Sequence, residues 1–217
     1  MRLFTIILTL FGATAPIAAP IEKIDPNQLL YTTPTINDAI PTALTETPLL
    51  PGGVVTHEDN WRQFEFVSSS YKRQIEKELE RINEIWKFKS VITSEYTAFR
   101  NVHVRKLIPS PISIPFTQSD FSALFGQKPT SFAFLGSSHA FRDIHATKSG
   151  GVAFYAEITG GKLSTLGIDS SGSPSLTKDT ISRLATFIKQ NKLVLVHWPS
   201  RTLLESPDAI VAYLNGK

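Results

Sequence analysis

The chain contains no cysteine among its 217 residues. Small exported domains that lack a large core are commonly held by disulfides, so this absence excludes a disulfide-knotted scaffold. No Asn-x-Ser/Thr site is present either, and N-glycosylation is therefore not expected. The fold must be held by packing alone, for which 14 Phe and 3 Trp supply large side chains.

Long hydrophobic runs are absent after the first residues of the chain. Arg2 precedes an apolar run over 3–15, and small residues end at Ala19. This order predicts a cleavable signal peptide over residues 1–19. A spanning helix needs about 20 apolar residues, and this run is shorter. We expect a secreted protein, extracellular or in a bacterial periplasm, with no membrane segment after cleavage.

Composition divides the remaining chain into two parts. Residues 20–53 are rich in Pro, Thr, Asn and Ala, which predicts a disordered or pro-like spacer. Residues 54–217 are long enough for a single globular domain with its own core. The alternatives for the spacer are a pro-segment, a tether or a disordered arm.

Charge is modest and unevenly distributed. The whole chain carries +3; Arg2 is the one charge in residues 1–19, and residues 20–56 hold one Lys against four carboxylates, a net −3. The remainder from His57 is therefore +5. Such a domain can meet an acidic protein partner, an anionic surface or a nucleic acid, although no motif supports the last. The alternative is that the charge serves solubility alone.

Periodicity and turn residues predict helices and strands in alternation. A helix over 70–89 has an apolar stripe of Tyr71, Ile75, Leu79, Ile82 and Trp86. Shorter helices are expected from Thr117 to Gly126, from Ser175 or Thr177 to Gln190, and from Ser206 onward, each with capping residues at its start. Strands are expected over 61–67, 91–98, 102–108, 131–135, 152–159, 162–169 and 193–196, with Gly160-Gly161 as a hairpin turn.

These elements predict an α+β fold in a single domain. We expect a mostly antiparallel sheet of five to seven strands, with the helices over 70–89 and 177–190 packed on one side.

A first candidate site follows the strand at 131–135. The segment from Phe132 to His139 resembles the nucleophile segment of SGNH-type hydrolases, in which a serine after such a strand attacks an ester. The resemblance implies Ser138 as the nucleophile, with a histidine near the C-terminus to take its proton, and His139 beside Ser138 is a further candidate. This chain has Ser137 where the family has Asp, and Val194 three residues before His197 where the family has Asp. The alternative is a polar turn.

A second candidate set suits phosphodiester hydrolysis, which needs a general acid and base and a cation. His103 and Arg105 alternate onto one face of their predicted strand, and Tyr155 and Glu157 do the same in the hairpin. Loop residues between them can converge on the same face: His139, Arg142 and His145. Alternation also produces such sets on any solvated sheet face.

Metal and cofactor patterns are weak. Residues 57–59 and the set His139, Asp143 and His145 lack a recognised ligand spacing, so we expect ordinary loops there. Phosphate-binding and dinucleotide-binding glycine patterns are absent. We expect no metal and no cofactor.

The chain's organisation is similar to that of small secreted effectors of plant-associated fungi, including the smut type. The features that carry this resemblance are the leader ending at Ala18-Ala19-Pro20, the spacer to Gly53 and one domain without glycosylation sites. A bacterial inhibitor or immunity protein fits the same features. The resemblance implies a non-enzymatic protein that binds a host or target protein; the alternative is a secreted hydrolase, either RNase-like or SGNH-like.

Overall fold

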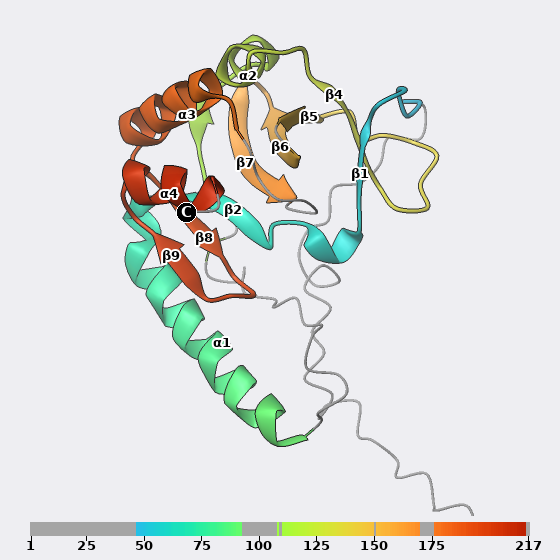
Figure 1. Ribbon diagram of the computed structural model, residues 1–217. Coiled ribbons are helices and arrows are strands. Elements are labelled where there is room, and N and C mark those ends of the chain that lie inside the picture. Colours follow the sequence, from blue (N-terminus) through green and yellow to red (C-terminus); the bar gives the residue numbers. More distant parts are fainter. Residues whose placement is uncertain (1–46, 93–107, 109, 150, 170–175, 216–217) are drawn as a thin grey trace, which may run out of the picture.

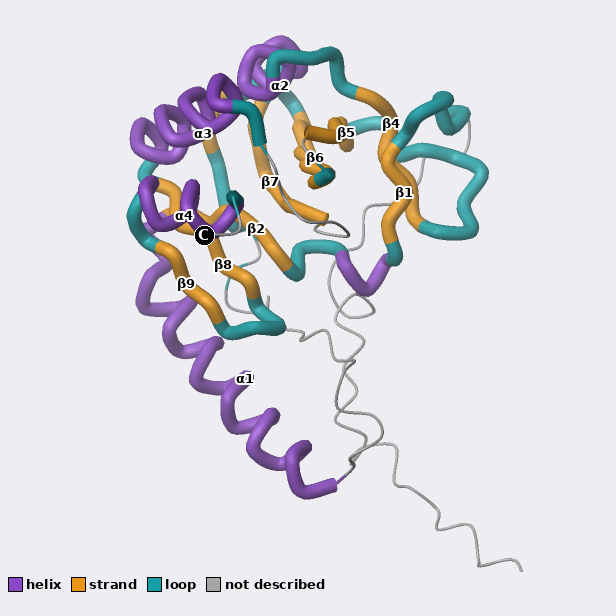
Figure 2. The backbone as a smooth tube through the Cα atoms, viewed as in Figure 1, coloured by secondary structure: helices purple, strands orange, loops and turns teal. Residues whose placement is uncertain are grey.

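The structure, a computed structural model, describes residues 47–92, 108, 110–149, 151–169 and 176–215. Within these ranges nine strands form one sheet accompanied by four α-helices (Figures 1 and 2). The strands are β1 (Val54–Thr56), β2 (Phe64–Ser68), β3 (Ile114–Pro115), β4 (Thr130–Phe134), β5 (Ile144–Ser149), β6 (Val152–Thr159), β7 (Lys162–Asp169), β8 (Leu193–His197) and β9 (Thr202–Leu204). The helices are α1 (Lys72–Ile92), α2 (Gln118–Phe125), α3 (Lys178–Asn191) and α4 (Pro207–Leu214).

The sheet is antiparallel except at one end. Its order is β1-β4-β5-β6-β7-β2-β8-β9, with β3 paired to β7. Only β1 and β4 run parallel among the described pairs. The α+β class and the mostly antiparallel sheet are therefore confirmed.

Several elements begin or end where the capping and turn residues predict. The β6–β7 hairpin has the predicted bounds, and Gly160 and Gly161 have φ of 58° and 72°, as a turn with two left-handed residues requires. Thr117 and Asp120 form the predicted capping box of α2, which ends at Gly126 with φ of 71°. Of the two candidates, Thr177 is the N-cap of α3. Ser206 caps α4, with Pro207 in its first turn.

Helices cover both faces of the sheet. Leu184 of α3 and Leu195 of β8 share one core cluster with residues of α2 and α4. Ile75 and Ile82 of α1 pack in another cluster, with Val194 of β8. Val194 and Leu195 are neighbours in a strand and point to opposite faces. The expectation that both long helices pack on one side is therefore wrong for α1, which lies across β8 and β9 from α4 (Figure 1). Both faces of β8 are apolar, so each must be shielded from water by other elements.

Several predicted strands differ. Val91 and Ile92 are helical in α1, while residues 93–98 and 102–107 and the Trp86 side chain lie outside the described residues. β2 begins at Phe64 rather than at residue 61, because Arg62 has a left-handed φ of 57°. β5 occupies a stretch expected to be a loop. The short strands β1, β3 and β9 were also not expected.

Folded contacts begin before the expected boundary at Val54. Ala140 N donates to Thr47 O at 2.9 Å, and Pro48 forms an isolated bridge with His139. Leu50 N donates to Ser131 Oγ at 2.9 Å. Residues 47–53 are thus held against β4 and the loop after it.

Candidate functional site

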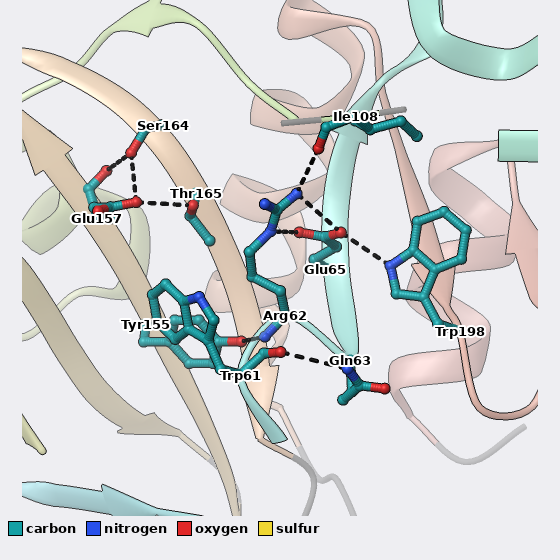
Figure 3. Close-up of polar contacts among 10 residues, drawn as sticks. All are labelled: Trp61, Arg62, Gln63, Glu65, Ile108, Tyr155, Glu157, Ser164, Thr165 and Trp198. Carbon is teal, nitrogen blue, oxygen red and sulfur yellow. Dashed lines mark hydrogen bonds and ion pairs between the residues drawn. The ribbon is translucent and has the colours of Figure 1, made fainter. Parts of the chain in front are cut away.

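A buried ion pair lies on the sheet face that α1 covers. Glu65 of β2 is 0% exposed, and its cross-strand neighbours are Gly167 of β7 and Val196 of β8. Phe64 and Phe66 point to the other face and join the core under α3. Arg62 Nε donates to Glu65 Oε2 at 2.6 Å (Figure 3). A carboxylate at this depth requires such a partner, because removing a charge from water is costly.

The pair connects distant parts of the chain. Trp198 Nε1, just after β8, donates to Glu65 Oε1 at 2.9 Å. Arg62 Nη2 donates to Ile108 O at 3.1 Å and, more weakly, to Glu65 Oε1 at 3.4 Å. β2, the end of β8 and the chain at Ile108 therefore meet at one carboxylate and one guanidinium.

The side chain of Tyr155 holds the backbone of Arg62 through a hydrogen bond. Arg62 N donates to Tyr155 Oη at 2.7 Å, and the Tyr155 ring stacks on Trp61 with centroids 4.8 Å apart. Gly167 lies under the Tyr155 ring, and a Cβ at this position would overlap that ring. The glycine thus permits the ring position, and the ring position supports the left-handed turn at Arg62.

Glu157 lies on the same sheet face as Tyr155, as alternation predicted. It is half-buried and pairs across the sheet with Thr165. Ser164 Oγ and Thr165 Oγ1 donate to Glu157 Oε2 at 2.8 and 3.1 Å (Figure 3). The two hydroxyls therefore fix the carboxylate on the sheet surface.

The rest of the phosphodiester set does not gather around Glu157. His145 belongs to β5 and pairs with Ala156, whereas Ile144 pairs with Glu157, so His145 faces the other side of the sheet. Burial lowers the pKa of His145, and the nearby Asp143 opposes this shift. Arg142 is exposed in the preceding loop. His103 and Arg105 lie outside the described residues.

Ser138 and His139 stand in a turn after β4, as predicted. Ser138 Oγ is 3.0 Å from His139 Nδ1, and both residues are exposed. Ser137 organises the turn, since its Oγ donates to His139 O at 2.8 Å and accepts from His139 N at 3.1 Å. A hydroxyl beside an imidazole nitrogen has the proton-transfer geometry of an activated serine.

His197 forms a second hydroxyl–imidazole cluster, at the end of β8. Its Nδ1 lies 2.9 Å from Ser200 Oγ and 3.2 Å from Tyr213 Oη, and its ring packs on Phe64 with centroids 4.8 Å apart. Burial lowers the pKa of His197. The neutral imidazole therefore links the sheet to α4.

Exposed apolar side chains gather at one end of the sheet. Among the described residues, the large hydrophobic side chains that are clearly exposed are Leu50, Val55 and Leu135, at 53%, 42% and 70%. Val55 pairs with Ala133 in β4, and Leu135 continues that ladder by donating its N–H to Thr56 O at 2.8 Å. Leu50 contacts Ser131, two residues before Ala133. We call Leu50, Val55 and Leu135 the β1–β4 edge.

The Arg62–Glu65–Trp198 network was missed at the sequence level. Glu65 alternates with Phe64 and Phe66, a pattern typical of a solvent-facing position. Val67 shares the Glu65 face and was the one local signal that this face is buried. Trp198 stands just after the predicted strand at 193–196, and it is fully buried.

Among the described residues, no three His, Asp or Glu side chains converge as a metal site would require. In the same ranges no helix has the length and apolar character needed to cross a membrane. Comparison with protein-family models, curated proteins and solved structures gave no match.

Proposed function

We propose that this is a secreted protein, of effector or inhibitor type, that acts by binding another protein through the β1–β4 edge. The observation that carries the proposal is the position of Leu50, Val55 and Leu135 together at one end of the sheet. Grouped apolar side chains in contact with water are typical of interaction surfaces.

The backbone at this end supports the same role. Within the part of the chain that the structure describes, β1 is the terminal strand of the sheet and pairs with β4 alone. Its outer side offers main-chain groups to a partner, because an edge strand has hydrogen-bonding capacity on one side only. The exposed His139 turn adjoins the edge through the Pro48–His139 bridge, so it can supply polar contacts at the rim.

Charge indicates the kind of partner. The chain from His57 onward carries +5, which favours an acidic protein and makes its association faster at low salt. A host or target protein with an acidic rim around an apolar centre fits these properties.

The test uses the mature chain as bait in host and periplasmic extracts, with Leu135→Asp as the edge variant and Thr159→Asp as the control. Thr159 is exposed at the end of β6. A partner retained by wild type and by Thr159→Asp, but lost with Leu135→Asp, supports the proposal. Partners that all survive Leu135→Asp would contradict it.

A second candidate is a secreted hydrolase, favoured by the 3.0 Å separation of Ser138 Oγ and His139 Nδ1. Ester and RNA hydrolysis should be assayed for wild type, Ser138→Ala and the His139→Ala, His103→Ala double variant. Activity that these changes abolish would establish turnover in place of binding alone. Ser137→Ala serves as the control for disturbance of the turn.

A further inference from the structure

An open groove lies between α2, α3 and β3, away from the β1–β4 edge. Its volume is about 450 Å³, within the usual range of ligand sites. Phe116, Leu124 and Phe187 give it apolar walls, and the rings of Phe116 and Phe187 pack with centroids 5.5 Å apart. α2 and α3 run side by side at this surface (Figure 1). The groove can therefore accept an apolar side chain.

One wall of the groove carries a positioned cation. Arg183 Nε donates to Leu124 O at 2.9 Å, and Arg183 Nη2 donates to Thr180 Oγ1 at 3.4 Å. Both acceptors are uncharged, and the ion pairs found among the described residues do not include Arg183. Arg183 is half-buried. Its remaining N–H groups can serve a carboxylate in the planar geometry that arginine favours.

Asp120 lies on the other wall of the groove, and its carboxylate already accepts hydrogen bonds from Thr117. Asp120 Oδ2 accepts from Thr117 N at 2.8 Å and from Thr117 Oγ1 at 2.7 Å, which completes the capping box of α2. Oδ2 of Asp120 thus serves the helix terminus, and Arg183 is the basic residue that lines the groove.

We propose that this groove binds a short segment of a partner protein in which an acidic residue stands beside an apolar one. The acidic side chain pairs with Arg183, and the apolar side chain packs on the half-buried ring of Phe187, which in turn packs on the buried Phe116. The groove is open, which suits a peptide segment passing along the surface. This inference rests on the proposed function in that it assigns the partner a second contact, with the acidic character that the net charge favours.

The probe is the peptide acetyl-Phe-Asp-Leu-amide, with acetyl-Phe-Asn-Leu-amide as its uncharged match, titrated into the mature chain and followed by amide NMR. We expect shifts at Phe116, Leu124 and Phe187, and about tenfold or greater weakening with the Asn peptide, because a charge-assisted pair is lost. Equal affinity for both peptides, or shifts confined to other surfaces, would overturn the proposal.

Variants of two basic residues in α3 complete the test. Arg183→Gln should remove the preference for Asp over Asn, whereas Lys189→Gln, an equal charge loss at an exposed residue outside the groove, should keep it. Arg183→Lys provides a second variant if Arg183→Gln loosens α2. If the folded Arg183→Gln variant still binds the Asp peptide more tightly than the Asn peptide, the proposal is wrong. Leu135→Asp should leave peptide binding unchanged, so failure here is distinguishable from failure at the β1–β4 edge.

Discussion

Replacement of Glu65 by leucine tests whether the buried ion pair organises this face of the sheet. The Glu65→Leu change removes the acceptor of both Arg62 Nε and Trp198 Nε1. Arg62 would stay buried and keep its hydrogen bond to Ile108 O. Removing one member of a buried ion pair costs about 3–5 kcal/mol, because the charge that remains loses the opposite charge that offset its removal from water.

A double variant separates the charge effect from packing. Arg62→Met combined with Glu65→Leu removes both charges and leaves the strain of the left-handed residue unchanged, since Met also carries a Cβ. Trp198 Nε1 and Ile108 O lose partners, at about 1–3 kcal/mol for a buried polar group. We therefore expect the double variant to be more stable than Glu65→Leu alone by about 2 kcal/mol.

Urea unfolding followed by far-UV circular dichroism measures these differences without relying on Trp198 fluorescence. With a denaturant slope of about 2 kcal/mol/M, the Glu65→Leu loss lowers the midpoint by about 1.5–2.5 M. Glu205→Gln, which breaks the exposed pair with Lys72 at 2.7 Å, is the control and should shift the midpoint little. A Glu65→Leu midpoint close to that of wild type, or a double variant no better than the single one, would refute the reasoning.

Three further predictions concern stability. Ile82→Ala should cost about 2–5 kcal/mol, because Ile82 of α1 is fully buried in the cluster that contains Val194 of β8; an unchanged urea midpoint would contradict this packing. A chain beginning at residue 47 should melt at the same temperature as one beginning at residue 20. A chain beginning at Val54 should melt lower, because it loses the contacts that Thr47, Pro48 and Leu50 make; equal melting of all three would show these contacts to be negligible. Burial lowers the pKa of His197 below its ordinary 6.5, so the unfolded chain binds more protons and stability falls as the pH drops below about 6.5. His197→Asn should flatten that part of the pH profile, and an unaltered slope would count against this role for His197.

Elements stabilised by neighbouring residues were predictable. The capping box of Thr117 and Asp120, the Ser206-Pro207 start of α4 and the Gly160-Gly161 turn each depend on contacts within a few residues. Such signals survive in any tertiary context. The first candidate site was predictable for the same reason, since the Ser138–His139 contact joins adjacent residues.

Elements stabilised by their partners were not predictable. Three of the strands have only two or three residues, too few for a periodic pattern: β1, β3 and β9. They are strands because they hydrogen-bond to the longer strands β4, β7 and β8. β5, with the sequence Ile-His-Ala-Thr-Lys-Ser, contains small and polar residues that are also typical of loops, and its pairing with β6 makes it a strand.

By itself, the sequence determined that this chain folds as α+β, where its hairpin turns and where three of its helices begin, because short-range hydrogen bonds and backbone conformations specify these features. The tertiary structure alone decided that α1 and α3 take opposite faces and that Glu65 is buried. Glu65 and Trp198 are hydrogen-bonded although 133 residues separate them in the sequence, and 93 residues separate Arg62 from its partner Tyr155. No local pattern encodes contacts of that range, because they depend on which strands become neighbours when the sheet closes over its core.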